Sequence, residues 1–308
     1  MPQDPAPPAG ALDQAASDFE DVRPGLFGIA YRMLGSVTEA EDVVQDVWIR
    51  WQTTDRSVVR DPGAFLVTAT TRLAINVAQS ARSRREAYVG PWLPEPVDTS
   101  ADPVLGAERG EAVSLAVLLL LETLTPTERA AFVLREAFDY PYPKIAAVLA
   151  QSEANARQLV SRARKHIGSG RREPVAPADQ RRLLETFLVA ARAGDPAGLE
   201  TLLAADVVSY SDGGGIKGVV RVPILGRTRV ARFVVGFSTR RWTDVEIEWV
   251  AVNGQTGALI SHGGQPVALL ALDASVAGID RLLWVMSPAK LGVFAGSVGR
   301  DRSGMRGV

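Results

Sequence analysis

The chain has no cysteine among its 308 residues and only two histidines, His166 and His262. The lack of cysteine excludes disulfides, thiolate metal sites, iron–sulfur clusters and thiol nucleophiles. Two histidines are too few for a histidine-rich metal site. The sequence therefore predicts a cytoplasmic protein that uses no metal ion and no cofactor.

Long hydrophobic runs are also missing. The densest one, Ala112–Leu121, is about half of the roughly 18 to 20 residues that a membrane span needs. The first twenty residues contain aspartate and proline instead of a basic stretch followed by an apolar block, so no secretory signal is expected. No membrane partner is predicted.

The chain has almost no excess of either charge, because its formal net charge is −1. The distribution of charge along the chain is nevertheless uneven. Basic residues gather at 72–86 and at 153–172, whereas residues 39–46 carry four acids and no base. Two basic clusters in a nearly neutral chain indicate local contact with a polyanion such as nucleic acid. The alternative is that these clusters are solvated helix faces.

The length suggests about two domains, at roughly 150 residues each, and the 46% hydrophobic content is that of a globular chain. Helical periodicity gives way to strand-like segments with glycine turns near residue 204, which is typical of an α+β domain. The predicted fold class is multidomain, with two all-α domains followed by a C-terminal α+β domain. The expected segments are a disordered leader (1–16), a helical domain (17–88), a linker (89–110), a second helical domain (111–172), the α+β domain (178–296) and a disordered tail (297–308).

The second helical domain contains a helix-turn-helix pattern. A short helix over Tyr142–Leu149 and a turn at Ala150-Gln151 precede a longer helix with a basic face. Glycine is usual in such a turn, so an alanine there is expected to cost some free energy. Arginine reads guanine and Asn or Gln reads adenine in the major groove. The predicted base readers are Asn155, Arg157 and Gln158, and the predicted phosphate contacts are Arg162, Arg164 and Lys165. A plain helical hairpin with a solvated basic face is the alternative.

Taken in order, several motifs resemble bacterial extracytoplasmic-function (ECF) sigma factors, which give RNA polymerase its promoter specificity. The similar segments are Ala30-Tyr31-Arg32-Met33-Leu34-Gly35, Glu39–Trp48, Ala64–Asn76 with Arg82–Arg85, and Leu124–Lys165. The resemblance implies that polymerase core and promoter DNA are the partners. It implies that core polymerase is bound by Asp42, Gln45 and Asp46, for which a solvated acidic face is the alternative. It further implies contacts to the −10 element by Arg72, Asn76, Arg82, Arg84 and Arg85, and to the −35 element by Asn155, Arg157, Gln158, Arg162 and Lys165.

The last 130 residues or so resemble the cone-shaped fold of nuclear transport factor 2, ketosteroid isomerase and the SnoaL-like polyketide cyclases. One subgroup of ECF sigma factors carries such an extension. Three motifs indicate this subgroup: Trp92-Leu93-Pro94-Glu95-Pro96, Asp212-Gly213-Gly214-Gly215 with Lys217, and Ser287-Pro288-Ala289-Lys290-Leu291. The subgroup's usual last motif is Asn-Pro-Asp-Lys-Leu, so Ser287 and Ala289 depart from it. We expect whatever those two side chains hold together to be weaker here.

The linker is predicted to dock on the C-terminal domain. A solvated spacer does not need Trp92 and Leu93 side by side, since exposure of each would forgo roughly 1.5–3 kcal/mol. A glycine run permits close backbone approach. We therefore expect Trp92–Pro96 to pack near Asp212–Lys217, so that the C-terminal domain regulates the two DNA-reading domains. The residues assigned to this role are Trp92, Leu93, Pro94, Asp212, Gly213, Gly214, Gly215 and Lys217.

Two other classes of function fit parts of the sequence. One is a cone-fold enzyme fused to a DNA-binding module, with Tyr210, Asp212 and His262 as candidate acid–base residues. His262 beside two glycines and Asp212 before three glycines are more typical of turns, so no catalytic residue is predicted. The other is a one-component repressor that uses the same helix-turn-helix. A small apolar ligand in the cone is a further possible partner.

Overall fold

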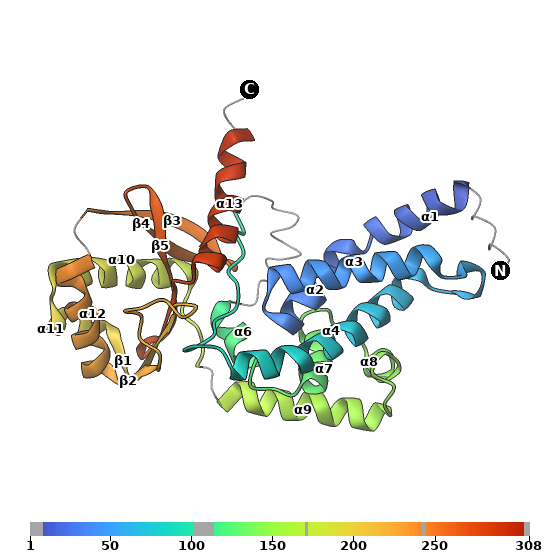
Figure 1. Cartoon of the computed structure of the whole chain (residues 1–308). Helices are drawn as coiled ribbons and strands as arrows, with labels where there is room; N and C mark the ends of the chain where they lie inside the picture. Colours follow the sequence, from blue (N-terminus) through green and yellow to red (C-terminus); the bar gives the residue numbers. More distant parts are fainter. Residues whose placement is uncertain (1–8, 101–113, 170–171, 242–243, 305–308) are drawn as a thin grey trace. The chain divides into compact units, whose positions relative to one another are not determined.

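The computed structural model describes residues 9–100, 114–169, 172–241 and 244–304 (Figure 1). They form two compact units. The first consists of Met1–Ser83 and Leu121–His166, and the second of Arg84–Leu120 and Ile167–Val308. The linker residues up to Ser100 thus belong to the same unit as the C-terminal domain. No helix among the described residues is long and apolar enough to cross a membrane.

The first unit is all-α. Its elements are α1 (Ala9–Glu20), α2 (Arg23–Leu34), α3 (Val37–Thr53), a 3₁₀ turn (Arg56–Val58), α4 (Pro62–Glu86), α7 (Pro126–Glu136), α8 (Tyr142–Leu149) and α9 (Glu153–Ser169). Gly35, in the left-handed conformation, ends α2, and the Ser36 hydroxyl caps α3 by accepting from the amide of Glu39. At α7 the Thr125 hydroxyl and the Glu128 carboxylate form a reciprocal capping box. The helical domains expected from the sequence are thus present.

The expected disordered leader is wrong for residues 9–16, which form most of α1. This helix is held in place by its packing on α3. Ala15 and Phe19 are buried, Phe19 lies 5.0 Å from the ring of Trp48, and the indole of Trp51 donates to the Ala15 carbonyl over 3.0 Å. The composition of the leader carries no sign of these long-range contacts. Residues 1–8 lie outside the described part.

The second unit contains a six-stranded sheet whose strand order is β2-β1-β6-β5-β4-β3. Strand β1 pairs parallel with β6, and every other pair is antiparallel. The strands are β1 (Leu203–Asp212), β2 (Ile224–Leu225), β3 (Val245–Val252), β4 (Gln255–His262), β5 (Gln265–Ser275) and β6 (Gly278–Val285). Helices α10 (Pro177–Ala193), α11 (Pro196–Leu202) and α12 (Arg227–Arg241) share one apolar core with one face of the sheet. The predicted α+β domain is confirmed.

Strand β2 has only two residues, because Pro223 lacks an amide donor for the ladder and Gly218 takes a positive φ of 88°. One expectation for the C-terminal end of the chain is wrong. The tail expected to be disordered from residue 297 continues as helix α13 (Pro288–Gly304), which packs on β5 through the buried Leu291 and Phe294. Residues 305–308 lie outside the described part. Helix α6 (Leu115–Leu121) stands at the division between the two units.

The turn of the helix-turn-helix shows the strain expected from its sequence. Ala150 ends α8 in the left-handed conformation, with φ 53° and ψ 46°, and the amide of Gln151 donates to the Ala146 carbonyl over 2.9 Å. This conformation costs an L-residue other than glycine roughly 1–2 kcal/mol. Alanine nevertheless preserves the turn that directs α9.

We predict that Ala150→Gly stabilises this turn by about 1 kcal/mol, since glycine adopts positive φ without a Cβ clash. Hydrogen exchange of the Gln151 amide in the full chain measures it, and we expect exchange to slow by about fivefold. Ala147→Gly is the matched control: it lies on the exposed side of α8, where glycine destabilises a helix by about 1 kcal/mol. Faster exchange in Ala150→Gly would show that the turn is not strained.

Candidate nucleic-acid interface

Helix α9 has one buried and one exposed face. Ala156, Leu159, Val160 and Ala163 are buried, and the exposed residues between them include Arg157, Gln158, Arg162, Arg164 and Lys165. Asn155 is half-buried and donates to the side chain of Gln151 over 2.7 Å, within the turn. The predicted base readers therefore lie at the N-terminal half of α9 and the predicted phosphate contacts further along it. This is the arrangement that a recognition helix needs.

The arginines of α9 are paired with carboxylates. Arg157 pairs with Glu153, Arg162 with Glu128, and Arg164 with Glu136 over 2.7 Å. Hydrogen bonding to Glu136 raises the pKa of the Arg164 guanidinium. These side chains remain half-exposed, so each ion pair contributes only about 0–1 kcal/mol. Such pairs orient the guanidinium groups. Because each pair is weak, a DNA phosphate or a base edge can take the place of the carboxylate.

The residues predicted to contact the −10 element do not form one cluster. Arg72 donates from Nε to the Val148 carbonyl over 2.9 Å, so it caps the C-terminus of α8 while its side chain remains exposed. Asn76, Arg82 and Arg84 are exposed. Arg85 lies over the ring of Trp92, 3.7 Å from its centroid. Arg72 and Arg85 thus each contact another segment of the chain.

The acidic stripe of α3 is exposed as predicted. Asp42, Gln45 and Asp46 face solvent, whereas Val43, Val44 and Val47 are buried. Ile49, which was not among the predicted contacts, lies one turn after Gln45 and is 50% exposed. An apolar side chain beside the carboxylates suits a protein interface better than a purely solvated face. The sequence signal for Ile49 is its helical spacing, because an apolar residue there continues the face formed by Asp42, Gln45 and Asp46.

The linker is held by one buried carboxylate of the C-terminal domain. Asp212 is fully buried at the end of β1; its Oδ1 accepts from the Tyr88 hydroxyl over 2.6 Å and its Oδ2 from the Leu93 amide over 2.9 Å. Lys290 of α13 also donates to Oδ2, over 2.6 Å, and to the Leu93 carbonyl. Burial lowers the pKa of Lys290 and raises that of Tyr88. We call Tyr88, Leu93, Asp212 and Lys290 the linker clamp.

The packing expected between the linker and the glycine run is observed. A Cβ added to Gly214, whose φ is 58°, would lie 2.9 Å from the Ser287 hydroxyl and 3.4 Å from that of Tyr88. The side chain of Trp92 is half-buried, with the Lys290 ammonium 4.4 Å from its ring centroid. Pro94 is buried. The expected contact of Lys217 with the linker is not observed, because Lys217 is exposed. The cation that pairs with Asp212 is that of Lys290. Lys217 stands next to the glycines in sequence, but the loop carries it outward.

Beyond the clamp the linker continues along the edge strand β3. The Val97 amide donates to the Asn253 side chain over 3.0 Å, the Asn253 amide returns a bond to the Val97 carbonyl, and Thr99 donates to the Ala251 carbonyl. Leu93 and Val97 are buried. The described linker residues thus form part of the C-terminal domain in structural terms.

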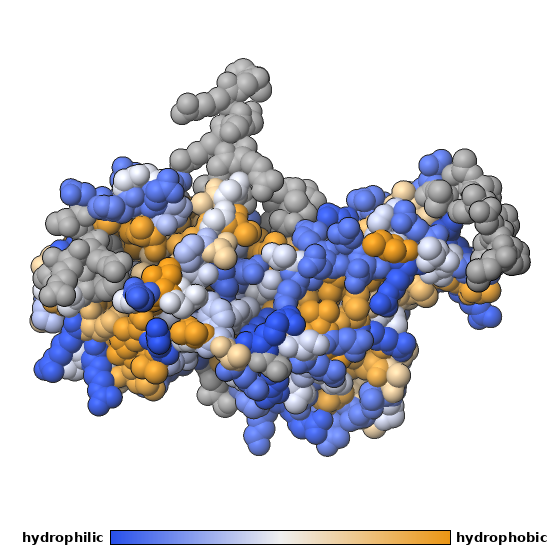
Figure 2. All heavy atoms as spheres, in the orientation of Figure 1, coloured by the Kyte–Doolittle hydropathy of each residue, from blue (hydrophilic) through white to orange (hydrophobic). Residues whose placement is uncertain are grey.

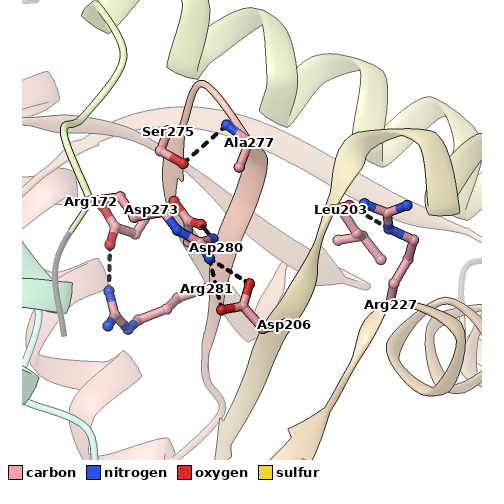
Figure 3. Close-up of polar contacts among 9 residues, drawn as sticks. All are labelled: Arg172, Leu203, Asp206, Arg227, Asp273, Ser275, Ala277, Asp280 and Arg281. Atoms are coloured by element: carbon pink, nitrogen blue, oxygen red, sulfur yellow. Dashed lines mark hydrogen bonds and ion pairs between the residues drawn. The ribbon is translucent and has the colours of Figure 1, made fainter. Parts of the chain in front are cut away.

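The chain is also attached where it leaves α9. Arg172 pairs with Asp206 over 2.8 Å and with Asp280, and it lowers the pKa of Asp206 (Figure 3). Two residues later Pro174 forms a bridge with Ser275, and the Val175 amide donates to the Ala274 carbonyl over 3.2 Å. The C-terminal domain therefore binds the chain on both sides of the segment that contains the helix-turn-helix.

Comparison with known proteins matches two segments of the chain to family models. Residues 19–85 match the model of sigma-70 region 2, and residues 114–167 match that of sigma-70 region 4. The chain is 38% identical over 253 residues to the ECF RNA polymerase sigma factor SigJ of Mycobacterium tuberculosis, covering 79% of this chain and 80% of the relative. The chain belongs to the ECF sigma factors.

Two further matches cover nearly the whole of this sigma factor. A probable ECF sigma factor of M. tuberculosis, SigI, is 30% identical over 285 residues, which are 91% of this chain and 95% of the relative. The crystal structure of M. tuberculosis SigJ superposes with a TM-score of 0.73 at 32% identity, covering 90% of this chain and 98% of that chain. The family resemblance stated from the sequence is thereby confirmed, including the NTF2-like type of the C-terminal domain.

The cone of this sigma factor contains a small, partly open apolar cavity between the sheet and α12. It is lined by Ser211, Gly218, Val219, Val220, Phe233, Val234, Trp284 and Met286. None of these side chains is an acid or a base. The candidate residues of the enzyme hypothesis lie elsewhere: Asp212 is occupied by the linker clamp, and His262 is exposed at the end of β4.

We predict that Lys290→Met releases the linker from the C-terminal domain of this sigma factor. Removal of one partner of a buried ion pair costs about 3–5 kcal/mol, because Asp212 is then left charged without its cation. The measurement is hydrogen exchange of the Leu93 amide, which we expect to lose most of its protection.

Lys217→Met is the matched control, because it removes an exposed lysine from the neighbouring loop. It should leave the exchange of the Leu93 amide unchanged. Asp212→Asn combined with Lys290→Met should restore part of the protection, since the buried charge is then gone. Full protection in Lys290→Met alone would exclude Lys290 from the clamp.

Proposed function

We propose that this protein directs promoter-specific initiation by core RNA polymerase and that its C-terminal domain regulates this activity through the linker. Region 2 and region 4 carry the polymerase and DNA contacts, and the protein works with the polymerase in the cytoplasm. The observation that carries the regulatory part is the linker clamp, which makes the connection between the two regions a part of the C-terminal domain.

The proposed polymerase contact is the exposed face of α3. Asp42, Gln45 and Asp46 form its polar part and Ile49 its apolar part. Exposed carboxylates give an interface its orientation and its rate of association, while a buried apolar side chain adds affinity. This combination supports the role that the family resemblance gives to these three polar residues.

The proposed promoter contacts follow the position of each side chain. On α9, Asn155, Arg157 and Gln158 are assigned to bases of the −35 element, and Arg162 and Lys165 to phosphates. In region 2, Asn76, Arg82, Arg84 and Arg85 are assigned to the −10 element. Arg72 is assigned to it only if the hydrogen bonds to α8 open.

We predict that Arg157→Ala costs roughly 1–3 kcal/mol on the correct −35 sequence and relaxes preference at one or two positions. Lys165→Ala should weaken all sequences about equally and reduce the salt slope of binding by about one. Both are measured as holoenzyme affinity for a set of promoter variants at several salt concentrations. If Arg157→Ala weakened every sequence alike, it would be a phosphate contact.

The regulatory proposal follows from where the clamp and the Arg172 cluster lie along the chain. The clamp begins two residues after α4, and Arg172 lies three residues after α9. A free linker could extend by roughly 3.3–3.6 Å per residue, whereas the stretch from Tyr88 to Ser100 is fixed to the sheet. The C-terminal domain thus limits the distance that regions 2 and 4 can span on a promoter.

We predict that Trp92→Ala and Leu93→Ala change the amount of transcript from the cognate promoter without changing the affinity for core polymerase. Run-off transcription with reconstituted holoenzyme and a core-binding titration measure the two quantities. Removal of the residues after about 175 should act in the same direction. Val276→Ala is the control, because this valine is 99% exposed and lies outside the linker. Wild-type transcription from both linker variants and the truncated form would contradict the proposal.

We further propose that the C-terminal domain is not an enzyme. The cavity offers no acid or base, and proton transfer requires one within hydrogen-bond reach of the substrate. Its apolar lining favours a small apolar ligand over a charged one. The family membership also separates this chain from a one-component repressor that uses the same helix-turn-helix.

A further inference from the structure

A third basic stretch lies in the C-terminal domain, outside both sigma regions. Between Gly213 and Thr243 the sequence has no acidic residue and seven basic ones. These are Lys217, Arg221, Arg227, Arg229, Arg232, Arg240 and Arg241. Nothing in the cavity or in the linker clamp requires this imbalance of charge.

Four of these side chains are exposed and lack carboxylate partners. Lys217 and Arg221 lie in the loop between β1 and β2, and Arg229 and Arg232 lie three residues apart on α12, hence on one face of it. None of the four forms an ion pair or hydrogen bond with a described residue. Arg227, by contrast, donates to the Leu203 carbonyl (Figure 3).

The loop and the helix are neighbours in the fold. Gly218, Val219 and Val220 of the loop line the same cavity as Phe233 and Val234 of α12. The four cations therefore border one area of the surface, which we call the α12 basic surface. Figure 2 shows strongly hydrophilic side chains projecting from the area that α12 occupies in Figure 1.

The loop that carries Lys217 and Arg221 lies against the residues that follow α4. A Cβ added to Gly90 would lie 3.5 Å from the Cα of Arg221, and one added to Gly215 would lie 3.9 Å from Val89. Arg84 and Arg85, a few residues earlier, belong to the same compact unit.

We propose that the α12 basic surface binds the phosphate backbone of promoter DNA. Unpaired, exposed arginines without a nearby acid suit phosphates, and contacts to phosphates carry no sequence information directly. The contact is therefore independent of sequence. It rests on the promoter binding proposed above, and it makes the C-terminal domain a direct DNA-binding part of the initiation complex.

The salt dependence of promoter binding by the holoenzyme tests this inference. Each phosphate contact contributes about 0.9 to the slope of log affinity against log salt. We expect Arg229→Gln with Arg232→Gln to reduce the slope by about one to two, equally on all promoter sequences. The control is Arg181→Gln with Arg182→Gln on α10, whose arginines are already paired with Glu185 and Asp179. A wild-type slope in the α12 variant would overturn the proposal.

A second measurement locates the contact. The chain has no cysteine, so Arg229→Cys carries a single thiol for an iron chelate that cleaves nearby backbones. We expect cleavage of promoter DNA from position 229 and none from Arg181→Cys. Cleavage of polymerase subunits alone would show a protein-binding surface and overturn the proposal. A wild-type holoenzyme that fails to bind promoter DNA would instead contradict the proposed function itself.

Discussion

The arrangement of the chain depends on the hydrogen bonds and the ion pair that both oxygens of the Asp212 carboxylate form. A buried carboxylate is costly unless its oxygens are hydrogen-bonded and its charge is paired. Here the Tyr88 hydroxyl, the Leu93 amide, the Gly214 amide and the Lys290 ammonium satisfy it together, and Tyr88 and Leu93 lie just before and within the linker. The C-terminal domain therefore cannot bury Asp212 at low cost without binding the linker. This makes the link between regions 2 and 4 conditional on the fold of the third domain.

The departures from the subgroup's usual Asn-Pro-Asp-Lys-Leu motif leave this interaction intact. Ser287 is buried before the first residue of α13, accepts the Leu291 amide on its carbonyl, and hydrogen-bonds the Tyr88 hydroxyl through its side chain. Ala289 is exposed, and its methyl side chain cannot form a hydrogen bond with a clamp residue. The contacts of the clamp are thus present without Asn and Asp at these two positions, and the weakening expected there stays a prediction.

The sequence predicted what depends on local pattern and missed what depends on distant partners. The helix-turn-helix followed from periodicity and a turn, and the docking of the linker followed from Trp92 and Leu93 in a proline-rich stretch. The choice of Lys290 over Lys217 did not follow, because the two lysines differ in burial, which only the packing of α13 decides. The hydrogen bonds of Arg72 to α8 did not follow either, because their carbonyl acceptors lie more than seventy residues away in sequence.

The two proposed DNA-binding surfaces differ in how their charge is balanced. The arginines of α9 are each paired with a glutamate, so their positive potential is partly cancelled in the free protein. DNA can replace these partners at about 0–1 kcal/mol each, and the replacement favours a sequence that returns bidentate bonds. The cations of the α12 basic surface have no such partners and attract any phosphate backbone. The two surfaces thus have different roles. The α12 basic surface, which is not neutralised, attracts DNA of any sequence. The α9 surface, which is partly neutralised, keeps its affinity for the correct promoter element.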